Sequence, residues 1–233
     1  MLQSQAHRYR CMCSVTLLQH NLAMRIQELL ESKNKSVITI NNLYHVGSLD
    51  QSKKRSGSLE GSGLSVSTKP DAWRRIARGH VAGDTYRAIK PGNKFLNARS
   101  ITKKIRSDIT TWALNNNLIE QATIYRVSHY DDELESTVYS DFETLKQAER
   151  EAYDKEDIQE IPGGIKATNK LRSISNNPNI SATGILDYVL PLYAQDQGYD
   201  GVWWNDILDV NKWSAPRGVI VPSMISTWKF EKI

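Results

Sequence analysis

The chain has 233 residues, of which 39% are hydrophobic and 24% charged, and its formal net charge is +4 at pH 7. This length predicts one substantial core, since a domain usually takes roughly 100–200 residues. Mean hydropathy is −0.50, and no apolar run approaches the ~20 residues of a membrane helix, which argues against a membrane protein. Only a broken apolar stretch follows Arg8 and Arg10, so we expect no signal peptide.

The charges are unevenly distributed along the chain. Residues 53–106 hold 14 Lys or Arg against 3 Asp or Glu, whereas residues 131–160 hold 12 acidic residues against 3 basic ones. A basic tract of this kind suits a polyanion, either a nucleic acid or the pyrophosphate of a dinucleotide. The alternative is two solvated faces that neutralise each other.

The two cysteines, Cys11 and Cys13, are one residue apart. That spacing is poor for a disulfide, and His7 and His20 are too loosely placed to complete a zinc site. We therefore expect free thiols in a reducing cytoplasm, and no metal.

The first part of the chain is predicted to begin with a helix. Apolar residues recur at helical spacing over residues 15–32, among them Leu18, Leu22 and Ile26. The elements expected after it are strands over residues 37–40 and 43–46, a Ser-, Gly- and Lys-rich loop over 51–63, a strand over 64–67 and a helix starting at Pro70.

The remainder is predicted to mix short strands with helices. The expected elements are strands over residues 85–89 and 94–98, a helix over 100–117, a strand over 122–127, a helix over 144–153, an irregular stretch over 163–179, a helix over 181–194 and strands over 201–204, 217–221 and 225–230. This irregular order favours an α+β fold over a doubly wound sheet, and no Gly-x-Gly-x-x-Gly follows a strand.

Several familiar chemistries lack their motifs. The sequence has no Gly-x-x-x-x-Gly-Lys-Ser/Thr, no Gly-x-Ser-x-Gly and no His-Glu-x-x-His. What remains is three strand ends rich in polar and small residues: Leu43-Tyr-His-Val-Gly-Ser48, Gly63-Leu-Ser-Val-Ser-Thr68 and Gly198-Tyr-Asp-Gly-Val-Trp-Trp-Asn-Asp206.

These three segments resemble, in order, the motifs of mono-ADP-ribosyltransferases of the bacterial toxin or effector kind. Tyr-His-x-Gly-Ser is similar to the entry motif, and Gly-Leu-Ser-Val-Ser-Thr before Pro-Asp-Ala-Trp is similar to the second motif. Gly-Tyr-Asp-Gly-Val-Trp-Trp-Asn-Asp is similar to the third. The resemblance implies an α+β fold with a split mixed β-sheet core, flanking helices and long loops. Residues 1–40 would be a helical N-terminal extension and residues 41–233 the catalytic domain.

The same resemblance implies a site for NAD as a substrate, with no metal. Asp206, at a position where much of the family has Glu, would be the catalytic acid, and Asp209 is the alternative. His45 would act with the catalytic acid by holding a ribose of NAD. The residues implied in NAD binding are Tyr44, His45, Val46, Gly47, Ser65, Ser67, Trp73 and Trp204. The aromatic that stacks on nicotinamide could be Trp73, Tyr86 or Trp204. Arg and Lys residues of 53–106, for example Arg74 or Arg75, could steady the pyrophosphate.

The chemistry explains why a carboxylate is needed. Breaking the bond between ribose and nicotinamide passes through an oxocarbenium-like state, as in glycoside hydrolysis. A carboxylate aimed at the ribose therefore binds the transition state better than the ground state. In a plainer interpretation, His45 is a hydrogen-bonded residue at a strand end and Asp206 caps a turn.

The acceptor of ADP-ribose is expected to be a macromolecule, either RNA, DNA or protein. The family includes toxins and defence or anti-defence effectors, so an antitoxin-type neutralising protein is a further expected partner. Two alternatives remain open. One is a non-catalytic nucleic-acid-binding module that uses residues 53–106, with Trp73, Tyr86 or Trp112 for stacking. The other is an NAD glycohydrolase.

Overall fold

The structure is a computed structural model that describes residues 36–50, 63–76, 83–131, 135–204 and 216–233, with only the backbone of Trp73, Arg75 and Ile76. Within these ranges the chain forms an eight-stranded mixed sheet, a separate three-stranded sheet and several helices. The predicted α+β class is confirmed. The helix expected over residues 15–32 and nearly all of the loop expected over 51–63 lie outside the described residues.

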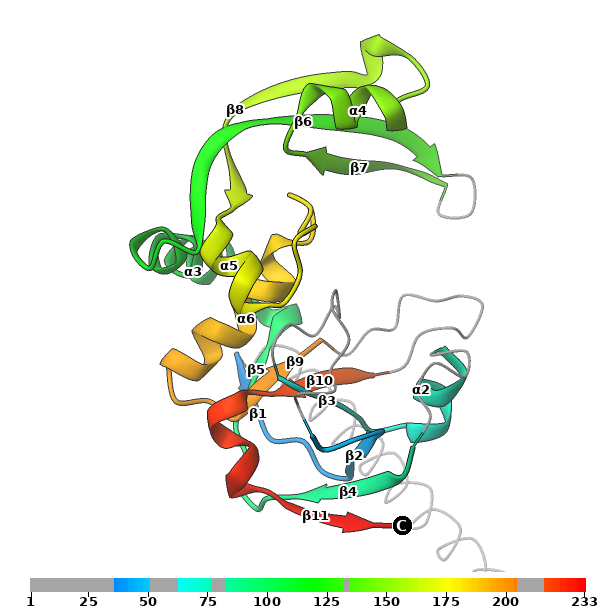
Figure 1. Cartoon of the computed structure of the whole chain (residues 1–233), viewed down its shortest axis with the longest axis vertical. Helices are drawn as coiled ribbons and strands as arrows, with labels where there is room; N and C mark the ends of the chain where they lie inside the picture. Colours follow the sequence, from blue (N-terminus) through cyan, green and yellow to red (C-terminus); the bar gives the residue numbers. More distant parts are fainter. Residues whose placement is uncertain (1–35, 51–62, 77–82, 132–134, 205–215) are drawn as a thin grey trace, which may run out of the picture.

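Short strands build the larger sheet (Figure 1). They are β1 (Val37–Ile38), β2 (Leu43–Val46), β3 (Leu64–Ser67), β4 (Thr85–Ile89), β5 (Phe95–Asn97), β9 (Gly201–Trp203), β10 (Arg217–Ile220) and β11 (Lys229–Lys232). Their order across the sheet is β1-β5-β9-β10-β3-β2-β4-β11, in which β5 and β9 are parallel and the other neighbours antiparallel. Because Val37 already pairs with Leu96, this sheet begins before residue 41.

Threonine caps start three of the helices. The helices are α2 (Pro70–Ile76), α3 (Lys103–Asn115), α4 (Leu145–Glu151), α5 (Asn169–Ile174) and α6 (Ile185–Asp196). The hydroxyls of Thr102, Thr144 and Thr168 accept hydrogen bonds from backbone amides in the first turns of α3, α4 and α5. Each cap satisfies an amide that has no partner inside its helix, so these sequence positions determine where the helices begin.

The smaller sheet extends away from the larger one (Figure 1). It consists of β6 (Ile119–Asp131), β7 (Ser136–Phe142) and β8 (Ile158–Ala167), in the order β7-β6-β8. The irregular stretch predicted over residues 163–179 is wrong up to Ile174, because β8 continues to Ala167 and α5 follows. Gly164 in β8 has a packing role, because a Cβ there would lie 2.4 Å from the side chain of Ile124.

The end of the chain also differs from the prediction of a strand over residues 225–230. A 3₁₀ helix covers Pro222–Thr227, and β11 begins only at Lys229. Pro222 occupies the first turn of this helix, where its fixed φ is favourable and its missing N–H is not needed. Trp228, directly before β11, is buried.

Buried side chains cover both faces of the larger sheet. On one face Leu96, Val202 and Val219 pack with α3 and α6, and Trp204 joins this cluster. On the other face lies a second cluster of Leu43, Leu64, Val66, Ala88, Phe95, Trp203, Ile220 and Trp228. Successive side chains of a strand point to opposite faces, so Trp203 and Trp204 belong to different cores. In the described part of the chain, no helix combines the length and apolar character that crossing a membrane requires.

Candidate functional site

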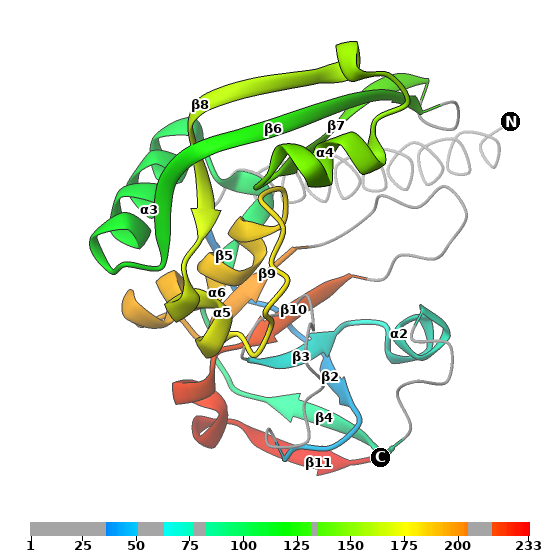
Figure 2. The same cartoon turned by 45° about the horizontal axis from the view of Figure 1, so that its top comes forward.

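The three polar segments, far apart in the sequence, lie on neighbouring strands of the larger sheet. β2 is antiparallel to β3, so Val46 at the end of β2 lies toward the start of β3, opposite to the edge where β3 ends. β9, β10, β3 and β2 are consecutive in its order. Ser67 at the end of β3 pairs with Arg217 on one side and Tyr44 on the other, and the amide of Trp204 donates to the carbonyl of Arg217 at 2.9 Å. The ends of β3 and β9 therefore reach the same edge of the sheet, and α2 follows β3 there (Figure 2).

The register decides which side chains share a face. Directly paired residues on antiparallel strands point to the same side. A row therefore runs across five strands, formed by Trp204, Arg217, Ser67, Tyr44 and Arg87. We call this side of the sheet the Tyr44 face.

The next row on the Tyr44 face contains Ser65 and Val46, two residues away from Ser67 and Tyr44 along their strands. Five residues implied in NAD binding thus share one face: Tyr44, Val46, Ser65, Ser67 and Trp204. Tyr44 and Ser65 are half-buried, whereas Val46, Ser67 and Trp204 are buried.

Trp204 is held on two sides. Its indole nitrogen donates to Oδ1 of Asp187 at 2.9 Å, and the guanidinium of Arg217 lies over its ring, 5.0 Å from the centroid. Asp187 stands in the first turn of α6, where the helix dipole favours a carboxylate. The ring is therefore a rigid wall at the end of β9.

The Tyr44 face also carries two arginines, Arg217 and the exposed Arg87. Guanidinium groups in one row suit a ligand with phosphate or carboxylate groups. By contrast, the hydroxyl of Ser67 is occupied within the protein. It donates to the carbonyl of Pro216 at 2.5 Å and accepts from the amide of Lys69 at 3.0 Å.

His45 lies on the opposite face, next to Val66 in the register. Its Nδ1 is 2.8 Å from the carbonyl oxygen of Ser65 and its Nε2 is 3.1 Å from that of Ser48. Both contacts are hydrogen bonds at once only when both ring nitrogens carry a proton, since both partners are acceptors. The ring ties β2 to β3 and to the turn after β2, and it stacks with Tyr86 at 6.5 Å.

Gly47 allows a close approach of two backbones. Its φ is 122°, and its amide donates to the carbonyl of Asp84 at 2.9 Å. A Cβ on Gly83, whose φ is 144°, would lie 2.9 Å from the Cα of Gly47. L side chains disfavour the φ angles of both glycines, and at Gly83 a side chain would also meet the backbone of Gly47.

Asp200, in the Gly-Tyr-Asp-Gly segment, has a structural role. It is buried, and its carboxylate accepts hydrogen bonds from the ammonium of Lys90 and from the amide of Lys94, the latter at 2.8 Å. The following Gly201 leaves no room for a side chain, because a Cβ there would lie 1.9 Å from the carbonyl oxygen of Val219. This pair anchors the start of β9 to the connection between β4 and β5.

Some predicted residues lie outside what the structure describes. Asp206 and Asp209 fall in residues 205–215, and the side chain of Trp73 in α2 is not described. The guanidinium of Arg74 donates to the hydroxyl of Thr85. The sequence did not point to Asp187, and it offered Arg87 only as one of the basic residues of 53–106, because only strand pairing and helix packing bring the two to the site.

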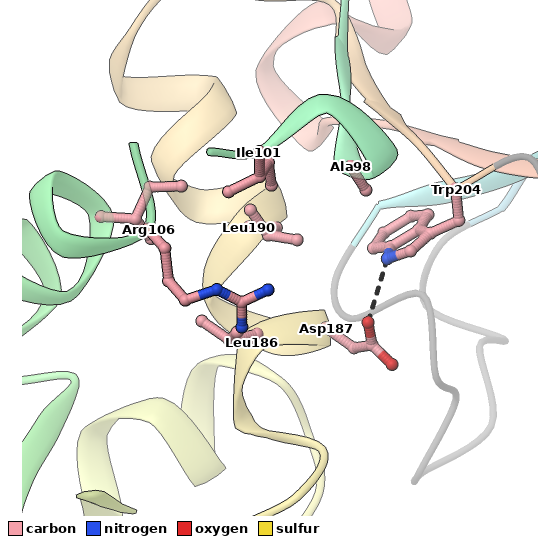
Figure 3. Close-up of a pocket in the computed structure, with 8 residues that line it drawn as sticks. Ala98, Ile101, Arg106, Leu186, Asp187, Leu190 and Trp204 are labelled. Carbon is pink, nitrogen blue, oxygen red and sulfur yellow. Dashed lines mark hydrogen bonds between the residues drawn. The ribbon is translucent and has the colours of Figure 1, made fainter. Parts of the chain in front are cut away.

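A small cavity lies on the α3 and α6 side of the sheet, beside Trp204. Its volume is about 160 Å³, and Arg106 and Asp187 flank its apolar side chains (Figure 3). The lining residues are Ala98, Ile101, Arg106, Ile109, Leu186, Asp187, Leu190 and Trp204. In the ranges that the structure describes, no three His, Cys, Asp or Glu side chains gather as a group that could hold a metal ion.

Comparison of the chain with known protein families, with curated proteins and with solved structures finds no match in any of the three.

Proposed function

We propose that the chain is an NAD-dependent mono-ADP-ribosyltransferase, with an ADP-ribosyltransferase-like split sheet as its core. The observation that supports this most is the convergence of the three motif segments. β2, β3 and β9 lie in one run of adjacent strands, and five of the residues implied in NAD binding share the Tyr44 face. In the sequence Asp206 follows Trp204 by two residues, and β9 ends at Trp203.

In this proposal NAD lies along the Tyr44 face. The exposed Arg87 would bind its pyrophosphate, since guanidinium groups bind phosphate oxygens in bidentate fashion. Arg217 would keep the ring of Trp204 in position at the other end of the row. Tyr44 and Ser65 would offer polar contacts to the riboses. We assign His45 a positioning role, because both of its nitrogens contact backbone carbonyl groups on the other face.

The reaction breaks the bond between C1′ of the ribose and the nicotinamide nitrogen. Nicotinamide leaves with the bonding electron pair, a nucleophilic atom of the acceptor forms the new bond to C1′, and that atom loses its proton. The carboxylate of Asp206 would stabilise the positive charge that develops on the ribose. The products are the ADP-ribosylated acceptor, nicotinamide and a proton.

The test uses NAD labelled in its adenylate phosphate, mixed with the purified chain and separate pools of cell protein, RNA and DNA. Wild type should label one pool. Asp206→Ala should lower the rate at least about a hundredfold, as the loss of one transition-state contact typically does. Asp209→Ala, an equal charge change three residues away, should keep most of the activity.

Two results would count against the proposal. If no pool is labelled and no nicotinamide is released, the chain does not use NAD. If both aspartate variants label as well as wild type, neither carboxylate is the catalytic acid and the transferase assignment fails. Release of nicotinamide without labelling would instead identify the NAD glycohydrolase alternative. Circular dichroism of each variant checks that the fold is retained.

A further inference from the structure

The cavity beside Trp204 has an apolar interior, with the charged residues Arg106 and Asp187 in its lining. Five apolar side chains line it, contributed by α3, α6 and the segment before α3: Ala98, Ile101, Ile109, Leu186 and Leu190. At about 160 Å³ it is slightly larger than an engineered cavity of about 150 Å³ that binds benzene. One planar six-membered ring can therefore fit inside, next to the indole of Trp204.

Basic residues gather just before α3 and in its first turn. Arg99, Lys103, Lys104 and Arg106 are all exposed, and residues 98–106 contain no Asp or Glu. None of these four side chains forms an ion pair or a hydrogen bond with any other residue that the structure describes. Arg106 itself lines the cavity, as Figure 3 shows. Arg106 at the cavity, with three further cations in the same short segment, suits a ligand that carries both a ring and a phosphate.

From these observations we propose that the cavity binds the single-ring base of a nucleotide, with its phosphates on Arg106, Lys103 and Lys104. A pyrimidine in a single-stranded nucleic acid is the source that the repeated cations favour, because each successive phosphate then meets one of them. The nicotinamide nucleotide half of NAD has the same chemistry, so the experiment has to separate the two sources.

The indole of Trp204, against which the base would stack, is already held in position. Asp187 holds the edge of Trp204 and Arg217 holds its face, so little ordering of the indole remains when a base binds. Asp206 follows Trp204 by two residues in the sequence, so a nucleic acid bound at this cavity could also be the acceptor of ADP-ribose. That further step rests on the proposed function. Binding of the nucleic acid to the cavity does not depend on the proposed function, and it can be measured without NAD.

The experiment measures fluorescence anisotropy of a labelled oligothymidylate with the full chain at several salt concentrations. Ala98→Leu narrows the cavity without a charge change, so it should weaken binding about tenfold and leave the salt dependence unchanged. Arg106→Gln removes one phosphate contact and should lower the slope of log affinity against log salt by about one. Arg150→Gln, the same change on the exposed face of α4, should alter neither quantity.

The proposal is overturned if Ala98→Leu binds the oligonucleotide as wild type does, or if Arg150→Gln reduces the salt slope as much as Arg106→Gln. Should Ala98→Leu unfold, Arg106→Gln and its control still decide the outcome through the salt slope. A parallel titration follows NAD binding by equilibrium dialysis. If Ala98→Leu weakens binding of NAD and not of oligothymidylate, the nucleic-acid assignment is wrong.

Discussion

Removal of the buried carboxylate of Asp200 should cost this fold about 3 kcal/mol. The side chain of Asp200 is 8% exposed and that of its ion-pair partner Lys90 is 25% exposed. In Asp200→Ala the amide of Lys94 loses its acceptor as well, and an unsatisfied buried amide costs about 1–3 kcal/mol. Breaking a buried pair typically costs about 3–5 kcal/mol, and we take the lower end because Lys90 can still reach water and Thr227.

Asp200→Asn separates the two contributions. The amide side chain keeps an oxygen that can accept from Lys94 but loses the charge that binds Lys90, so we expect a loss of about 1–2 kcal/mol. The measurement is the free energy of unfolding in urea, followed by tryptophan fluorescence and circular dichroism. Lys155→Gln is the control, because the side chain of Lys155 is 86% exposed and its pair with Glu149 spans 3.6 Å; it should change stability by less than about 0.5 kcal/mol.

An Asp200→Ala protein whose free energy of unfolding lies within about 1 kcal/mol of wild type would refute this role of Asp200, because about 1 kcal/mol is the lower bound for a single unsatisfied buried group. This role would also be refuted if Asp200→Asn destabilised as much as Asp200→Ala, because the hydrogen bond to Lys94 would then carry none of the effect.

Two further predictions concern a backbone contact and a titrating group. Gly83→Ala should lower the melting temperature clearly more than Gly92→Ala. Both glycines have a positive φ, but only the new methyl group at position 83 would meet a backbone, that of Gly47. Equal decreases in the two melting temperatures would contradict a steric cause. Burial, and then nearby acidic groups, raise the pKa of Tyr193 above its ordinary value of 10.0. The neutral phenol of Tyr193 is therefore favoured in the folded state. Its contribution to stability is present below the pKa of the tyrosine in the unfolded chain, and it is lost as pH rises through the pKa of Tyr193 in the folded protein. Tyr193→Phe should accordingly lose less stability than wild type when melting is followed from neutral pH to above about pH 10; parallel losses in both proteins would contradict the prediction.

Local sequence patterns were sufficient for much of the secondary structure. β2, β3 and β4 lie where alternating apolar residues and flanking turn residues predicted them, because the side-chain pattern of a half-buried strand is a local property. The start of α3 at Lys103 likewise follows from the Thr102 cap. Prediction failed where a local signal had a non-local cause. The Gly163-Gly164 pair is typical of a loop, yet Gly164 sits inside β8 to make room for Ile124, which lies about 40 residues earlier.

For the candidate site, the sequence by itself determined which residue types stand at three strand ends, and hence the proposal of NAD chemistry. Only the tertiary structure decided their partners, because the face on which a strand residue lies depends on its register with strands from distant parts of the chain. Pairing of Tyr44 with Ser67, and of Ser67 with Arg217, places the tyrosine on the Tyr44 face and turns His45 away from it. The cavity beside Trp204 needs α3, α6 and β9 to pack together, and no local pattern contains that contact.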